Sequence, residues 1–414
     1  MRRGHNGGAK RAARRGTSVS SRTKRPDESA LVAACCRWPP SPERDEAVIA
    51  AAGKIADWAG VLQLAARHRV EGLAHAALQG TGIGLPPDIG NALASRAQRI
   101  ASRNGLLTDE SVRLQRAFAA AGIASMILKG SALAQLAYGS VDFKQARDID
   151  LWVAPDDALA ALRHLEGDGY ALVLPRGPLD AAQRAAVLRY GREIELVHGV
   201  SKMRVELQWR LAAHPLLLRG VGATGARQTV TLPDGRALTT LADDDLFAYL
   251  CVHGAYHAWS RLKWLADLNA LIASRHPGDI AHLYRHAETR SAGLCAGQAL
   301  LLCQRILGLP LPAALAARLS ADRRIARLTR IASAAIHAPS VDRGRLATVL
   351  RNVGVPFLLG RGLAFYSVQA QVASVGLADV VRLPLPRGLH FLYPLLRLPF
   401  WLWRRGATLV RGRG

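Results

Sequence analysis

Apolar residues recur at helical spacing along most of this chain, and strand-like patterns are confined to its middle. Residues 28–121 repeat apolar side chains every three or four positions, which predicts helices divided by a Gly/Pro-rich break at 81–87. The helical spacing returns from residue 242 onward, where three aspartates suit the first turn of a helix running through Trp259. We find no internal repeat.

The middle zone mixes short apolar runs with helical segments. A helix with proline in its first turn is expected over 155–167, and a Pro-Asp-Gly-Arg turn predicts a hairpin between 229–232 and 237–241. The other expected strands cover 125–128, 148–153, 193–197 and 204–209. The sequence therefore predicts an α+β protein with a small mixed β-sheet core flanked by N- and C-terminal helical domains.

Shifts in composition set the domain boundaries. The expected domains are a basic tail (1–27), an N-terminal helical region (28–121), the mixed core (122–241), a helical domain (242–340) and a basic, apolar helical region (341–414). The tail is rich in Gly, Ser and Arg, so we expect it to be disordered. The alternative is a start codon placed too far upstream.

Asp148 and Asp150 stand one residue apart inside an apolar segment. Side chains alternate along a strand, so both carboxylates point to one face and repel each other unless a cation neutralises them. Carboxylate oxygens suit Mg²⁺ or Mn²⁺. The alternative is the solvated polar face of an edge strand.

Lys129-Gly130-Ser131 follows the first expected strand and turns into a helix over 132–138 that Ser131 is expected to cap. Glycine lets a phosphate approach the backbone, the helix N-terminus offers free N–H groups, and lysine adds positive charge. This order of strand, turn, helix and Asp-x-Asp strand predicts a phosphate cradle facing a metal site.

These motifs resemble the polymerase-β-type nucleotidyltransferase superfamily, and more narrowly a bacterial group of uncharacterised nucleotidyltransferases. The resemblance covers roughly 31–272, and its last motif is the most family-specific. Sixteen residues separate Ser131 from Asp148, more than is usual, and Gln208 stands where the narrower group often has histidine. The matching segments are Leu128-Lys-Gly-Ser-Ala-Leu, Tyr138, Arg147-Asp-Ile-Asp-Leu, Val205-Glu-Leu-Gln-Trp-Arg-Leu and the stretch from His253 to Asp267.

The resemblance implies a third carboxylate at Glu206, with a metal or base role. The alternative for Glu206 is an ordinary polar strand face, and Glu193 and Glu195 on a neighbouring strand are rival candidates. Two Mg²⁺ ions held by Asp148 and Asp150, with Glu206 completing one, would stabilise the attacking oxygen and the departing pyrophosphate.

The basic residues near these motifs, Lys129 and Arg147, also allow two interpretations each. Gly130 and Ser131 would cradle the β- and γ-phosphates of an NTP, expected to be ATP, with Lys129 or Arg147 adding charge. Lys129 could instead be a strand-end lysine in water, and Arg147 a surface partner of Asp142 or Asp148.

His253 and His257 lie four residues apart, hence on one helix face. Either they pack the helix against the sheet or they line the nucleotide cleft. Arg261, Lys263 and Asp267 are further candidates for the cleft wall.

The formal net charge of +24 first suggests nucleic acid or an anionic membrane as partner. Only seven of the 55 basic residues are lysine, however, and this skew is typical of a G+C-rich genome. Part of the charge therefore reflects codon bias, so nucleic acid is possible as a partner but is not favoured.

Five cysteines without a Cys-x-x-Cys pair indicate neither disulfides nor zinc, which suits the cytoplasm. No secretory signal and no spanning helix are expected. Residues 389–403 are aromatic and apolar, which predicts either a peripheral anchor on the anionic inner membrane face or a terminal helix packed on the body. The residues of the anchor are Trp401, Trp403, Arg404, Arg405, Arg411 and Arg413.

The favoured function is metal-dependent transfer of an NMP group from an NTP to an unknown acceptor, with release of pyrophosphate. The alternative is a catalytically weak module that binds nucleotide or nucleic acid in a regulatory role. Neither the acceptor nor the choice of NTP follows from the motifs.

Overall fold

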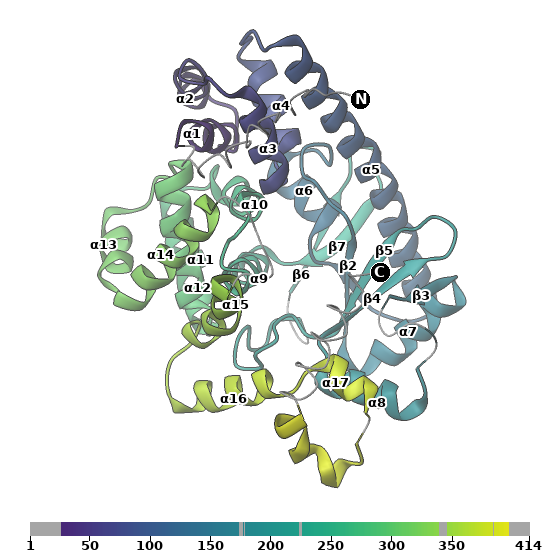
Figure 1. The fold of residues 1–414 in the computed structure, drawn as a ribbon. Coiled ribbons are helices and arrows are strands. Elements are labelled where there is room, and N and C mark those ends of the chain that lie inside the picture. The colour runs from purple at the N-terminus through teal and green to yellow at the C-terminus, as the bar shows by residue number, and fades with distance from the viewer. Residues whose placement is uncertain are drawn as a thin grey trace, which may run out of the picture.

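In the computed structural model, a mixed β-sheet lies beside the helices that precede it and follow it in the chain (Figure 1). The structure describes residues 26–173, 177, 179–222, 226–338, 346–383 and 385–396. The expected α+β class is confirmed, with helices before and after the strands in the chain.

The N-terminal helices pack as a group at one end of the molecule, and the longest of them continues along the sheet (Figure 1). That helix, α5, has 34 residues and starts after the predicted break. The first helix begins at Pro26, inside the expected tail. The bounds are α1 (Pro26–Cys35), α2 (Pro42–Ala52), α3 (Trp58–His68), α4 (Glu71–Gly80) and α5 (Pro87–Ala120).

The sheet has five strands in the order β1-β2-β5-β4-β3. Strands β2 and β5 run parallel, and the other neighbours are antiparallel. The four expected strands of the core are present, and β3 is the strand of this sheet that the sequence analysis missed. The bounds are β1 (Ser125–Ile127), β2 (Ile149–Val153), β3 (Tyr170–Leu172), β4 (Glu193–His198) and β5 (Arg204–Gln208).

The two faces of β2 belong to two different cores. Ile149, Leu151 and Val153 are buried with apolar residues of α5 and α7 (Ala158–Gly167). Trp152 is buried with residues of α9 (Asp243–Tyr256) and α10 (Leu262–Ile272). Alternation therefore turns Asp150 toward the same face as Trp152.

The remaining elements of the middle zone follow the expected order. A short 3-10 helix (Pro155–Asp157) leads into α7, and α8 (Ala181–Tyr190) follows β3. The predicted hairpin is confirmed as β6 (Arg227–Thr231) and β7 (Ala237–Leu241), a separate two-stranded sheet. Gln115 on α5 fixes it, donating to the Thr239 carbonyl (3.0 Å) and accepting from the Thr239 N–H (2.9 Å).

Helix α9 begins at the aspartates as expected but ends at Tyr256, not at Trp259. Ala258 and Trp259 have positive φ values of 51° and 48°, so the chain reverses after His257. This reversal buries the Trp259 ring, whose Nε1 donates to Gln298 Oε1 (3.2 Å). Burial of a large aromatic side chain outweighs the modest cost of two left-handed residues.

Later helices cover α9 and α10 and then return to the sheet side, where α17 packs against α8 (Figure 1). Their bounds are α11 (Pro277–Thr289), α12 (Gly293–Leu302), η2 (Cys303–Leu307), α13 (Ala313–Ala321), α14 (Arg323–His337), α15 (Leu346–Leu358), α16 (Leu363–Ser374), α17 (Leu377–Arg382) and η3 (Arg387–Leu392).

The predicted membrane anchor falls mostly outside the described residues, which end at 396, so its tryptophans and arginines remain a prediction. Among the helices that the structure describes, none combines the length and apolar character needed to cross a membrane. All five cysteines are buried and unpaired, as their spacing suggested.

Candidate functional site

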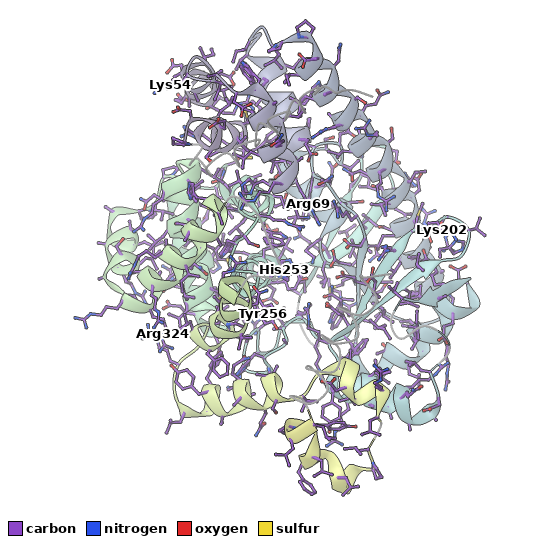
Figure 2. All side chains as sticks on the ribbon, in the orientation of Figure 1. Lys54, Arg69, Lys202, His253, Tyr256 and Arg324 are labelled. Carbon is purple, nitrogen blue, oxygen red and sulfur yellow. The ribbon has the colours of Figure 1, made fainter. Side chains whose placement is uncertain are left out.

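A cavity of about 200 Å³ lies where α6 (Gly130–Tyr138), α9 and α10 face β2 and β5. Arg69 and His253, two of its lining residues, lie in the centre of the view in Figure 2. Its charged lining residues include acids and bases in equal number, namely Asp148, Asp150, Glu193, Glu206 and Asp267 with Arg69, Lys129, Lys144, Arg192 and Lys263.

Asp150 and Glu206 are opposite each other on the parallel pair β2–β5. Gln208 bridges them, because its Nε2 donates to Asp150 Oδ1 (3.0 Å) and reaches Glu206 Oε2 (3.5 Å). The position at which the family often has histidine therefore carries a side chain that orients both carboxylates. Strand β2 is flanked on both sides and Asp150 is 4% exposed, so the solvated edge strand is wrong.

Burial and neighbouring negative charges raise the pKa of two carboxyl groups in this cavity, Glu206 and Asp148. Burial, followed by repulsion from Asp150 and Asp148, raises the pKa of Glu206 to about 8. Burial and the charge of Asp150 also raise the pKa of Asp148. A site that destabilises its own negative charge in this way favours a cation between the acids.

Lys129 supplies one such cation. Its Nζ lies 2.7 Å from Asp150 Oδ1, and the two side chains are only 13% and 6% exposed. Burial opposes the charged form of Lys129, but the attraction of Asp150 prevails and raises the pKa above its usual value. The alternative of a strand-end lysine in water is wrong.

Helix α6 begins at Gly130, two residues earlier than expected, and Ser131 does not cap it. The Ser131 hydroxyl instead shares a 2.7 Å hydrogen bond with Thr108 of α5 in a buried position. No side chain caps the helix, so the first N–H groups of α6 are not satisfied from within the helix. Gly130 lines the cavity with φ +57°, while Ser131 is not among the lining residues.

The long gap before Asp148 is an extended loop, residues 139–148, because α6 ends at Tyr138 as expected. Asn104 of α5 holds this loop: its Nδ2 donates to the carbonyls of Val141 and Lys144 (2.6 Å each), and its Oδ1 accepts from the Ala146 N–H (3.3 Å). Asn104 and Thr108 are one helical turn apart, so a single face of α5 positions both the glycine turn and the loop that delivers Asp148.

Arg147 is exposed and lies outside the cavity. It lines a neighbouring groove, and its carbonyl accepts from Arg103 Nη2 (3.0 Å). Within the described part of the chain it forms an ion pair with neither Asp142 nor Asp148.

Both candidate histidines line the cavity, with ring centroids 4.8 Å apart. His257 is the residue after α9 and stacks on Trp264 of α10 at 5.0 Å, so the pair packs against a helix as well as lining the cleft. Burial and the nearby charge of Lys129 lower the pKa of His257 to about 3 and that of His253 well below its usual value. Both rings are therefore neutral.

Asp267 organises the opposite wall. Its Oδ1 accepts from the Tyr138 hydroxyl (3.0 Å), and Lys144 Nζ lies 3.5 Å from its Oδ2. Lys263, one turn earlier on α10, donates to the Gln145 carbonyl (3.4 Å). Burial and repulsion by Lys144 lower the pKa of Lys263 to about 7. Of the three further candidates, Lys263 and Asp267 line the cavity and Arg261 does not.

Sequence reasoning missed Lys144, Arg192 and Arg69 as lining residues. One signal could have found Lys144: the sequence has only seven lysines, and three of them, Lys129, Lys144 and Lys263, line this cavity. Lys144 lies between the glycine turn and the Asp-x-Asp pair, so a rare lysine at that place in the chain was the signal to follow. Arg192 and Arg69 carry no comparable signal.

The two rival glutamates of β4 differ in surroundings. Glu193 lines the cavity and pairs with Arg192 Nη2 (2.7 Å). Glu195 is opposite Glu206 in the sheet but pairs with Arg204 and lines the neighbouring groove. Of these three glutamates, only Glu206 has its carboxylate within reach of the Gln208 amide that holds Asp150.

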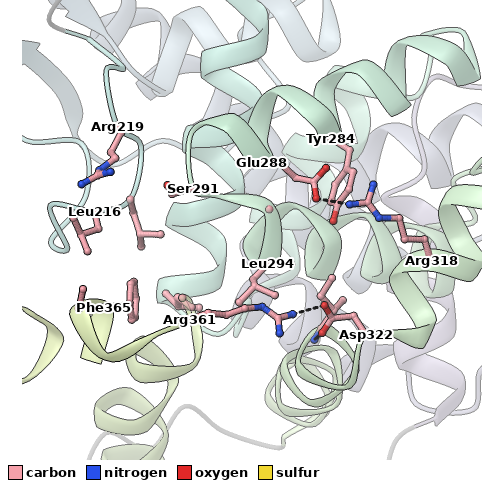
Figure 3. A pocket seen from close by; sticks show the side chains of 16 residues that line it. Leu216, Arg219, Tyr284, Glu288, Ser291, Leu294, Arg318, Asp322, Arg361 and Phe365 are labelled. Carbon is pink, nitrogen blue, oxygen red and sulfur yellow. Dashed lines mark hydrogen bonds and ion pairs between the residues drawn. The ribbon is translucent and has the colours of Figure 1, made fainter. Parts of the chain in front are cut away.

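A separate cavity of about 540 Å³ lies among α11–α14 and α16 (Figure 3). Its charged side chains neutralise one another across short contacts: Arg318 Nη2 lies 2.6 Å from Glu288 Oε1, and Arg361 pairs with Asp322. It holds no cluster of unneutralised acids among the described residues, so the cavity at the sheet fits the prediction from the motifs better.

The carboxylates do not form a closed metal cage. Across the residues that the structure describes, no three His, Cys, Asp or Glu side chains are gathered as a ready ligand set. Mg²⁺, however, is usually held by one or two carboxylates together with waters and substrate phosphates. Asp148, Asp150 and Glu206, which line one cavity and repel one another, suit that open arrangement.

Comparison with known proteins identifies the same region. The model of a family described as uncharacterised nucleotidyltransferase matches residues 54–308, which include every charged residue of the cavity. No curated protein matches the sequence.

Proposed function

Because this chain belongs to the family of uncharacterised nucleotidyltransferases, we propose that it moves an NMP group from an NTP to an acceptor hydroxyl and releases pyrophosphate. The observation that carries the proposal is the juxtaposition of Asp150 and Glu206, in register on parallel strands, with the uncapped start of α6. Acids for a cation and N–H groups for a phosphate thus meet at one cavity.

Asp148, Asp150 and Glu206 would hold divalent ions, Mg²⁺ or Mn²⁺. When bound, such ions neutralise the triphosphate and the charge that develops on the leaving pyrophosphate. The open ligand set leaves coordination positions for phosphate oxygens, as Mg²⁺ prefers.

The phosphates would lie at Gly130, where the first N–H groups of α6 face outward from the helix start. Positive φ and the lack of a Cβ at this position allow close approach. Lys129 is placed to exchange Asp150 for a phosphate oxygen once a metal neutralises the carboxylate. Lys144 and Arg192 add positive charge around the same cavity, and Lys263 would add more when a nearby phosphate favours its protonated form.

Glu206 would take the proton of the acceptor hydroxyl. Glu206 lies opposite Asp150 on the neighbouring strand and lines the cavity, which places its carboxylate beside the proposed metal site, where the acceptor hydroxyl would bind. The acceptor oxygen forms its bond to the α-phosphorus as the bond from that phosphorus to the β-bridging oxygen breaks. Pyrophosphate leaves with the bonding electrons.

A second candidate, a nucleotide-binding module without turnover, is favoured by one observation. The Lys129–Asp150 ion pair already neutralises one proposed metal ligand. If the pair persisted with nucleotide bound, the site would hold an NTP without transferring it.

The deciding experiment incubates the protein with each α-labelled NTP, ATP first, Mg²⁺ and cell extract, and follows pyrophosphate and labelled products. Asp148→Asn, Asp150→Asn and Glu206→Gln should each abolish both signals, as should EDTA. Asp156→Asn is the control, because Asp156 is an exposed aspartate shortly after the same strand. Equal pyrophosphate release by wild type and Asp150→Asn would reject transfer, and nucleotide binding without release would support the second candidate.

A further inference from the structure

An arginine-lined groove of about 770 Å³ adjoins the cavity and shares three lining residues with it: Arg69, Ala146 and Asp148. We name it the arginine groove. Its other arginines are Arg96, Arg99, Arg103, Arg147 and Arg204. Because Asp148 belongs to both linings, a molecule held in the groove would present its nearest atoms to the proposed metal site.

The arginines come from separate elements that converge. Arg96, Arg99 and Arg103 lie three and four residues apart on α5, hence on one face of that helix. Arg147 comes from the loop before β2, and its carbonyl is tied to Arg103 Nη2 (3.0 Å). A rigid helix and an anchored loop therefore present guanidinium groups to the same space.

Several of these guanidinium groups lack a carboxylate partner. Arg204 pairs with Glu195, and Arg96 lies 3.9 Å from Glu71. In the described ranges, no carboxylate oxygen comes within 4 Å of Arg99, Arg103 or Arg147. Exposed guanidinium forks of this kind match phosphate oxygens in pairs.

The groove also carries acceptor atoms that lack donors. Glu71 Oε2 and Gln145 Oε1 are buried and have no hydrogen-bond partner among the described residues. Both side chains belong to the groove lining, and Glu71 is only 7% exposed. A buried acceptor without a donor is costly, and turning either side chain toward the groove would let a ligand hydroxyl group satisfy it.

The lining contains no aromatic side chain; its apolar members are Ile100 and Ala146. Sites for single-stranded nucleic acid usually combine basic residues with aromatic platforms for base stacking. These features favour a compact ligand with phosphate at one end and hydroxyl groups at the other.

We propose that the arginine groove binds the acceptor, and that the acceptor is a small, polyhydroxylated phosphate ester. The proposal rests on the transferase function proposed above. Arg99, Arg103 and Arg147 would hold the acceptor phosphate, and Glu71 and Gln145, once turned toward the groove, would accept from its hydroxyl groups. A free hydroxyl near Asp148 then attacks the α-phosphorus, pyrophosphate departs, and Glu206 receives the hydroxyl proton.

Binding is measured first, without nucleotide, so that no turnover is needed. Glucose 6-phosphate serves as the probe in calorimetric titrations, with glucose and a ten-residue oligothymidylate as comparisons. Arg99→Gln/Arg103→Gln/Arg147→Gln should bind the phosphate ester at least about tenfold more weakly, the loss of one charge-assisted hydrogen bond. Arg116→Gln, an exposed arginine of α5 outside the groove lining, should bind as wild type. Circular dichroism verifies that the triple variant folds.

Pyrophosphate release with NTP, Mg²⁺ and the low-molecular-weight fraction of cell extract is measured next. The triple variant should need at least about tenfold more of that fraction for half-maximal rate. If wild type and triple variant need the same amount of the fraction for half-maximal rate, the groove does not bind the acceptor, although the transferase function could still hold. If neither the wild type nor any variant releases pyrophosphate, the proposed transferase function is wrong. The titrations alone then decide whether the groove binds phosphate esters. Arginine-dependent binding of the oligothymidylate without binding of glucose 6-phosphate would overturn the proposal.

Discussion

The ammonium group of Lys129 lies 2.7 Å from the carboxylate of Asp150, on the buried face of strand β2 that meets α9. One residue comes from the turn that starts α6 and the other from the strand bearing the Asp-x-Asp pair. The contact joins the two motifs directly. It makes Lys129 a candidate for exchange between a carboxylate and a phosphate.

Breaking this ion pair should destabilise the protein. Lys129→Met or Asp150→Asn alone leaves an uncompensated buried group and should lower the free energy of unfolding by about 3–5 kcal/mol. The double variant should lose clearly less than the sum, because both charges are removed together. Urea denaturation of the wild type, the two single variants and the double variant gives the four free energies of unfolding that are needed. If the losses of the single variants add up to that of the double variant, the two side chains have no interaction energy.

Metal affinity should rise with pH. The pKa of Glu206 is about 8 in the absence of metal, so below that pH a bound ion must displace a proton. We expect Mn²⁺ affinity to increase up to about tenfold per pH unit between pH 6 and 8 and then to level off. Mn²⁺ titrations followed by electron paramagnetic resonance test this. Glu206→Gln should flatten the curve, and a steep curve in that variant would assign the proton to another group.

Alanine variants of the glycines at the two ends of α6 distinguish the cost of backbone strain from an effect on nucleotide binding. Gly130 and Gly139 have φ values of +57° and +68°, and an added Cβ meets nothing within 4 Å at either position. Gly130→Ala and Gly139→Ala should each cost about 1–2 kcal/mol of stability. Only Gly130→Ala should also weaken ATP binding, because only Gly130 lines the cavity. Equal ATP affinities in calorimetry would remove the helix start from the binding site.

Acid should destabilise the fold through His68, whose Nδ1 accepts from the Leu262 N–H (3.1 Å). Burial and the charge of Arg67 lower its pKa to about 3, so the unfolded chain binds a proton at a pH where the folded one does not. Stability is complete above about pH 6.5 and falls by up to about 1.4 kcal/mol per unit as pH decreases toward 3. His68→Gln keeps an acceptor and should reduce this slope in urea titrations between pH 7 and 5. An unchanged slope would contradict the assignment.

Much of the architecture was determined by the sequence alone. Period-two alternation predicted three of the five strands, a short apolar run predicted a fourth, and turn chemistry predicted the hairpin, because these signals act over a few neighbouring residues. Alternation also placed Asp148 and Asp150 toward one cavity. The resemblance pointed to the family that the match over residues 54–308 establishes.

Tertiary structure decided what long-range packing controls. Ser131 reads locally as a cap, yet Thr108, 23 positions earlier, takes its hydroxyl, so the helix starts without one. Trp259 reads as helical, yet burying its ring bends the chain after His257. The wall of the cavity unites Lys129, Lys144 and Lys263 with acids from two strands, and the arginine groove unites α5 with a distant loop. Such sites depend on side chains that are far apart in sequence, and local periodicity carries no information about their meeting.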